Sequence, residues 1–220
     1  MKQKVPINEL LRIMAKLRSP QGCPWDREQD HMSLRFHAVE EVYELMDAIE
    51  SGNDQEFVEE LGDLLLQVVF HCQLAKERNA FDFDQVCHSI SEKLVRRHPH
   101  VFGNSKAKSV DAVWAQWEQI KKAEKAGTKQ ERSSAYDGIP RHLPALLKAE
   151  KLTKKARKAG ALSAPKSNKQ ITRSEIAATL FDLAVQAQAH GWSAEELLRS
   201  EVRKREKKFR KMEKKQNMKK

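Results

Sequence analysis

The sequence predicts an all-α protein. Apolar residues recur at three- and four-residue spacing along most of the chain, which is the period of an amphipathic helix. No segment shows the sustained alternation of apolar and polar residues that is typical of a half-buried strand. Only eight glycines and seven prolines occur in 220 residues, and most of them stand between the periodic segments. We therefore expect a helical bundle.

The first hundred residues predict four helices. The Pro- and Gly-rich segment 19–26 ends the first of them. Between the second and third, Gly52 is expected just past a helix end and Asp54 is expected as the next N-cap. The stretch 64–75 is apolar on more than one face, as at the centre of a bundle or at a subunit interface. The four helices are expected at about 7–17, 33–49, 55–76 and 84–97.

The rest of the chain is more polar and predicts shorter helical segments. A capping box, formed by Ser193 and Glu196, marks the start of the last and most basic helix. A linker-like stretch and a loop separate the helices that precede it. In order, we expect a helix at 111–125, a linker at 127–135, a helix introduced by the motif 137–152, a loop at 160–173 and a helix at 174–190.

The net charge of +10 suggests a nucleic-acid-binding protein, but the distribution of charge favours another interpretation. Residues 1–100 carry a net charge of −6, whereas the last 22 residues alone carry +9. This basic segment, 199–220, contains Phe209 as its only aromatic residue, so it lacks the aromatic residues that stack on nucleic-acid bases. We expect it to make at most weak, salt-sensitive contacts with nucleic acid.

The composition also bears on the location of the protein. No run of about 18 apolar residues is present, so we expect no membrane span. The N-terminal segment lacks the continuous apolar region of a signal peptide. The three cysteines, Cys23, Cys72 and Cys87, include no CxxC pair and are an odd number, which argues against a disulfide framework. We therefore expect a cytoplasmic protein.

Four carboxylates on two consecutive predicted helices are candidate metal ligands. Glu41 and Glu44 are three residues apart on one helix, and Glu60 and Asp63 are three apart on the next, so each pair shares a helix face. If the short connection makes the helices antiparallel neighbours, the four carboxylates converge and need a cation to offset their repulsion. Oxygen ligands without a paired histidine or thiolate favour Mg²⁺, with Mn²⁺ as an alternative. The competing interpretation is that both pairs are ordinary solvent-exposed helix surface.

The helix predicted at 84–97 carries candidate phosphate-binding residues. Lys93 and Arg97 are four residues apart and share one helix face. Cations in this arrangement can bind phosphate oxygens and stabilise the charge that develops in phosphoryl transfer. A solvated basic face is the alternative interpretation.

Six ordered motifs over about residues 8–155 resemble MazG, the bacterial nucleoside triphosphate pyrophosphohydrolase. The resemblance implies the fold of the all-α NTP pyrophosphatases, a helical bundle that forms a homodimer through its helices. It also implies hydrolysis of an NTP or dNTP to the nucleoside monophosphate and pyrophosphate. The motifs are CPWDREQ (23–29), EEVYELMDAIE (40–50), EELGDLLLQVVFH (59–71), EKLVRRHPHVFG (92–103), VWAQWEQIK (113–121) and DGIPRHLPALLKAEKL (137–152).

The resemblance also implies roles for individual residues. The metal motif of the family falls on the four carboxylates described above, which would serve as both metal ligands and catalytic residues. The phosphate-binding lysine and arginine of the family fall on Lys93 and Arg97. By position, His37 and Glu59 are expected to line the nucleotide site, and Trp117 to contact the base.

A weak internal repeat suggests how the chain is organised. Residues 60–75 align with 175–190, but Ala178 stands where the first copy has Asp63. We expect a catalytic domain at 1–125, a linker with the DGIPRHLPAL helix at 126–160, and a degenerate second-domain remnant at 161–220. The alternative function is that of a weak or inactive family member that acts through its basic tail on nucleic acid or as a regulator.

Overall fold

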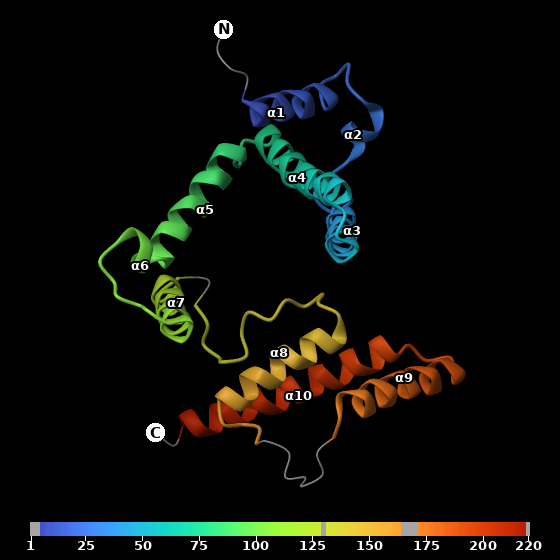
Figure 1. Cartoon of the computed structure of the whole chain (residues 1–220), viewed down its shortest axis with the longest axis vertical. Coiled ribbons are helices and arrows are strands. Elements are labelled where there is room, and N and C mark those ends of the chain that lie inside the picture. The colour runs from blue at the N-terminus through green and yellow to red at the C-terminus, as the bar shows by residue number, and fades with distance from the viewer. Residues whose placement is uncertain (1–4, 129–130, 164–170, 219–220) are drawn as a thin grey trace. The chain divides into compact units, whose positions relative to one another are not determined.

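The computed structural model describes residues 5–128, 131–163 and 171–218 and consists of helices joined by turns and loops (Figure 1). Over these residues there are ten helices and no strand, which confirms the all-α prediction. The chain divides into two compact units, Met1–Val113 and Trp114–Lys220, each with its own core. None of the helices in the described ranges combines the length and apolarity that a membrane span requires.

The first unit is organised around one long helix, α4 (Asp54–Glu77), against which α1 (Pro6–Leu17) and α3 (His37–Ser51) pack. Its core contains Met14 of α1, Leu34, and Val69, Phe70 and Leu74 of α4, all buried. The remaining helices of this unit are α2 (Pro24–Glu28), α5 (Phe83–Arg97) and α6 (Pro99–Phe102), and α7 (Val110–Lys125) crosses the division between the units.

The connection between α3 and α4 is only two residues long. Gly52 follows α3 with φ at +70°, in the left-handed region that ends helices and favours glycine. Asn53 then caps α4, since its side-chain oxygen accepts a hydrogen bond from the Gln55 backbone N–H at 3.0 Å. The prediction of Asp54 as the N-cap was wrong by one residue, because Asp54 is already the first helical residue. This tight connection places α3 and α4 side by side.

The helix expected from Ser33 begins instead at His37. The Asp30 carboxylate accepts hydrogen bonds from the backbone N–H groups of Met32 and Ser33, both at 2.7 Å. The Ser33 hydroxyl in turn accepts one from the Asp30 backbone N–H at 3.0 Å. Such local bonds compete with the helical pattern and hold residues 31–36 in turns.

The second unit contains α8 (Ala145–Lys158), α9 (Arg173–Ala189) and α10 (Ala194–Asn217), with α8 and α10 side by side (Figure 1). Its core includes Tyr136 and Phe209, whose rings stack with centroids 5.7 Å apart. Ser193 caps α10 by accepting from the Glu196 backbone N–H at 3.2 Å. Part of the predicted loop 160–173, namely 164–170, lies outside the described residues.

Candidate metal centre

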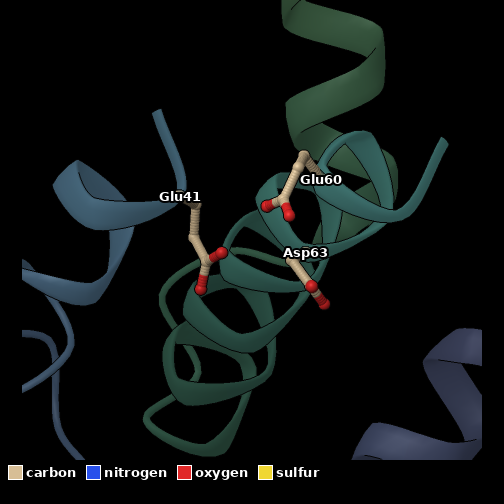
Figure 2. A group of neighbouring side chains, drawn as sticks. All are labelled: Glu41, Glu60 and Asp63. Carbon is tan, nitrogen blue, oxygen red and sulfur yellow. The ribbon is translucent and has the colours of Figure 1, made fainter. Parts of the chain in front are cut away.

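Three of the four candidate carboxylates converge between α3 and α4. Glu41 lies on α3, and Glu60 and Asp63 lie one turn apart on α4. One carboxylate oxygen from each lies within 4.8 Å of the other two, and all three residues are half-buried. Figure 2 shows Glu41 opposite Glu60 and Asp63, with the three carboxylates around one region between the helices. Three negative groups at this spacing repel one another unless they are protonated or share a cation.

The electrostatics of the group reflect this crowding. Partial burial raises the pKa of Glu41, a hydrogen bond from Gln67 lowers it, and the charges of Asp63 and Glu44 raise it further. The pKa of Glu60 is likewise raised, first by desolvation and then by the nearby charges of Glu44 and Asp63. The Oε2 atom of Glu60 is buried and has no hydrogen-bond partner among the described residues. A divalent cation would satisfy this oxygen and favour the ionised carboxylates.

Glu44 stands at the margin of the group. It is exposed and lies one turn after Glu41, and its carboxylate is not among the three that approach within 4.8 Å of one another. Its charge nevertheless raises the pKa of both Glu41 and Glu60, so it lies close to both.

The structure adds a residue that the sequence patterns did not indicate. Gln67 is buried on α4, four residues after Asp63, and its Nε2 donates a hydrogen bond to Glu41 Oε1 at 3.1 Å. Its own Oε1 is buried without a partner in the described part of the chain. The four-residue spacing from Asp63 is a signal in the sequence, because it places Gln67 on the same helix face.

The candidate nucleotide-binding residues near this group are exposed. His37 is the first residue of α3, where its ring packs edge-on against Trp25 with centroids 6.1 Å apart. Its Nδ1 also lies 3.7 Å from a carboxylate oxygen of Glu40. Glu59 is exposed beside Glu60, and its charge contributes to the raised pKa of Glu60.

The candidate phosphate-binding and base-contacting residues lie on other helices. Lys93 and Arg97 are half-buried in the last two turns of α5. Trp117 lies on α7, in the unit Trp114–Lys220. Its ring meets that of Trp114 edge-on, with centroids 5.4 Å apart, and Lys121 Nζ lies 4.3 Å from the centre of the Trp117 ring.

The donor set fits a hard divalent cation. All three converging groups are carboxylates, and no histidine or cysteine belongs to the group. Oxygen ligands of this kind suit Mg²⁺ and Mn²⁺, whereas zinc sites usually include nitrogen or sulfur ligands. Two carboxylates from α4 and one from α3 would fill only part of the coordination shell of such an ion, which leaves positions for water and for phosphate oxygens.

Comparisons with known proteins place these residues in a matched family segment. Residues 29–102 match the family model of the MazG nucleotide pyrophosphohydrolase domain. This segment includes the four carboxylates, Lys93 and Arg97, whereas Trp117 lies outside it.

Three relatives show the extent of the similarity. The nucleoside triphosphate pyrophosphohydrolase of Escherichia coli K12 is 49% identical over 155 residues, which are 70% of this chain and 58% of that protein. The nucleoside triphosphate pyrophosphohydrolase/pyrophosphatase MazG of Thermotoga maritima is 49% identical over 152 residues, 69% of this chain and 57% of that protein. An uncharacterized 26.1 kDa protein of Streptomyces cacaoi is 40% identical over 194 residues, 87% of this chain and 76% of that protein.

The chain therefore spans less than two thirds of the length of the E. coli and T. maritima relatives, but three quarters of the S. cacaoi relative. Within the shared part, the similarity includes all the motifs that supply the converging carboxylates. By sequence, by its all-α fold and by the length it shares with the S. cacaoi protein, the chain belongs to the MazG family.

Proposed function

We propose that this protein hydrolyses nucleoside triphosphates, with ribose or deoxyribose, to the monophosphate and pyrophosphate. The observation that carries the proposal is the convergence of Glu41, Glu60 and Asp63 within 4.8 Å inside the segment that matches the MazG model. The names of the E. coli and T. maritima relatives support the same reaction.

In this proposal the converging carboxylates, with Glu44 as a fourth ligand, hold Mg²⁺, and Mn²⁺ is the alternative ion. When bound, such an ion neutralises phosphate charge and lowers the pKa of a coordinated water. Lys93 and Arg97 bind phosphate oxygens, His37 and Glu59 line the nucleotide site, and Trp117 contacts the base.

In the proposed hydrolytic step, a glutamate accepts a proton from water and the basic residues stabilise the leaving group. Water attacks the α-phosphorus and gives a proton to one of the glutamates, while the bond between the α-phosphorus and the bridging oxygen breaks. The electron pair of that bond leaves with pyrophosphate, whose charge the α5 cations stabilise.

We also propose a homodimer formed through α3 and α4. Both helices present large apolar side chains to solvent, although they pack against each other. Their three- and four-residue spacing places them on one face of each helix, and an exposed apolar face is typical of a subunit interface. The exposed residues are Val39, Val42, Tyr43, Met46 and Ile49 on α3 and Val58, Leu61, Leu65 and Val68 on α4.

The proposal retains the division into a catalytic domain at 1–125, a linker segment at 126–160 and a degenerate second repeat at 161–220. It also retains a cytoplasmic location. All three cysteines are free thiols, which is the state that a reducing compartment maintains.

The direct test measures pyrophosphate release from a panel of NTPs and dNTPs by the purified full chain. We expect turnover with Mg²⁺ or Mn²⁺ and none with a chelator. In ¹⁸O-labelled water the label should enter the monophosphate, because the α-phosphorus is attacked. The proposal is wrong if a folded, metal-supplied sample releases no pyrophosphate from any nucleotide, or if the label enters pyrophosphate.

A second candidate function is that of a catalytically weak family member that binds nucleic acid, or regulates another process, through its basic tail. The observation that favours it is a row of cations on α10 that no carboxylate neutralises in the described structure. This function and the hydrolytic one are not exclusive.

A further inference from the structure

The carboxylates of α10 all have partners within the second unit. Each of the five glutamates either pairs with an arginine of α10 or accepts hydrogen bonds from the segments that pack against this helix. Glu195 and Glu196 pair with Arg199, Glu201 with Arg205, and Glu206 with Arg210, while Glu195 also accepts from the Ala145 N–H and Glu213 from the Ser134 hydroxyl and the Ala135 N–H. These glutamates therefore neutralise Arg199, Arg205 and Arg210.

Seven other cations of α10 remain without a carboxylate partner among the described residues. All seven are exposed. We call them the basic face of α10, and they are Arg203, Lys204, Lys207, Lys208, Lys211, Lys214 and Lys215.

These seven side chains share one side of the helix. At about 100° per residue they occupy an arc of about 140°, and they span about 18 Å along the axis. The buried residues Val202 and Phe209 project from the opposite side, toward the core that α8 shares. The packing of α8 against the opposite side of α10 therefore leaves the basic face exposed to solvent.

The chemistry of this face restricts its partner. From residue 203 to 215 it presents no large exposed apolar side chain, so it has nothing to insert into a lipid surface. The one aromatic residue of α10, Phe209, is buried against Tyr136 and is not available to stack on an unpaired base. What remains is a rigid row of positive charge, which complements a regular row of phosphates.

We propose that the basic face of α10 binds the phosphate backbone of double-helical nucleic acid without regard to sequence. A single helix about 10–12 Å across fits beside or within the major groove of B-form DNA, which is about 12 Å wide and has phosphates on both sides. The cations are mostly lysines, which bind phosphates as point charges and do not read base edges. This proposal rests on the second candidate function above, for which it names the partner, and it does not depend on nucleotide hydrolysis.

The test uses the full chain and a fluorescent duplex of about 20 base pairs, as DNA and as RNA, titrated at several salt concentrations. With seven phosphate contacts, the logarithm of the association constant should fall with the logarithm of salt at a slope of about −6. Replacement of Lys207, Lys208, Lys211 and Lys214 by Gln should reduce the slope to about −3 and weaken binding by about 100-fold or more at low salt.

The matched control replaces the four exposed cations of α8, Lys151, Lys154, Arg157 and Lys158, by Gln. It changes the net charge by the same amount and should leave duplex affinity within about twofold of wild type, allowing for long-range charge. Single variants, Lys208→Gln and Lys211→Gln, guard against misfolding of the quadruple variant, and each should lower the slope by about one.

Three outcomes would overturn the proposal. Equal losses in the α8 and α10 variants would show an effect of net charge alone. Tighter binding to anionic phosphatidylserine vesicles than to duplexes would assign the face to membranes. Unchanged duplex affinity in the folded α10 variants would show that the face has no part in binding. Pyrophosphate release should be the same in all of these variants, which separates this proposal from the hydrolytic one.

Discussion

Gln67 donates a hydrogen bond from its side-chain amide to the carboxylate of Glu41 over 3.1 Å, and this bond links α4 to α3 at the candidate metal centre. The bond lowers the pKa of Glu41 and so opposes the effect of burial, which raises it. Because Gln67 is itself buried, its amide has little freedom to turn away. We infer that Gln67 orients Glu41 and favours the ionised form that binds a cation.

Gln67→Met removes this hydrogen bond at nearly constant volume. We expect Mn²⁺ affinity, measured by calorimetry on the full chain, to fall by about 10- to 100-fold, which is typical of the loss of a group that orients a metal ligand. The control is Gln73→Met on the same helix, which removes a hydrogen bond to Glu77 instead. Equal Mn²⁺ affinity in the Gln67 variant and the wild type would contradict a positioning role.

Neutral variants of the carboxylates test the metal centre directly. Glu41→Gln and Asp63→Asn should each reduce kcat for pyrophosphate release by about 100-fold or more, because loss of a ligand weakens charge stabilisation in the transition state. Asp47→Asn, an exposed carboxylate on α3, is the matched control and should retain wild-type turnover. Full activity in either ligand variant would remove that residue from the proposed site.

The raised pKa values of Glu41 and Glu60 predict how stability depends on pH without metal. A carboxylate whose pKa is higher in the folded state than its usual 4.5 binds its proton more tightly when folded. Its contribution to stability is therefore complete below the pKa of the unfolded state and is lost as the pH rises through the pKa of the folded state. In the presence of a chelator, ionisation of this pair should lower the free energy of unfolding as the pH rises.

Glu60→Gln should weaken the fall of the unfolding free energy with rising pH, as measured by urea denaturation between about pH 4 and about pH 8. Added Mg²⁺ should stabilise the wild type most at the upper end of this range, where the carboxylates are ionised, because binding to the folded state alone raises stability. Added Mg²⁺ should raise the unfolding free energy of the Glu60→Gln variant by less. A larger Mg²⁺ effect at the acidic end would contradict this assignment of charge.

The helices and the acidic pairs could be predicted from the sequence because both depend on local spacing. Three-residue spacing and a short connection indicate that the carboxylates of two helices converge. Spacing does not determine which of them approach most closely, and Glu44 lies outside the closest group because that depends on side-chain conformation and helix packing. The spacing of Gln67 from Asp63 indicates a shared helix face, but an uncharged residue there gives no sign of a role at the site. Asn53 caps α4 although the adjacent Asp54 could have done so, and Asp30 holds a turn where a helix was predicted. Both side chains bond the local backbone in ways that hydrophobic spacing does not indicate.

The exposed apolar side chains of α3 and α4 predict self-association. Met46→Lys combined with Leu65→Lys should shift the protein from dimer to monomer in sedimentation velocity, because two charges would be buried in the interface of each protomer. Val110→Lys, at a residue that is 73% exposed, is the control and should leave the sedimentation coefficient unchanged. A monomeric wild type at micromolar concentration would contradict the proposed dimer.

The ion pair between Arg18 and Glu77 anchors the turn after α1 to the end of α4. Two hydrogen bonds of 2.7 Å join the side chains, and the Arg18 guanidinium lies 5.6 Å from the centre of the Phe70 ring. The Arg18 side chain is only 9% exposed, and Arg18→Met removes the charged partner of Glu77, which keeps its hydrogen bond from Gln73. We expect unfolding free energy to fall by about 2 kcal/mol near neutral pH. Arg12→Met, which breaks an exposed pair with Glu9, should have a much smaller effect because solvent screens that pair.

The pH dependence separates this ion pair from simple packing of the Arg18 side chain. The hydrogen bonds from Arg18 lower the pKa of Glu77 below the usual 4.5. The stability that this ion pair contributes is therefore complete above pH 4.5 and is lost as the pH falls through the folded pKa of Glu77. The difference between wild type and Arg18→Met in urea denaturation should therefore shrink in acid. A constant difference across the acidic range would mean that the guanidinium stabilises the turn by packing on Phe70 and not by its charge.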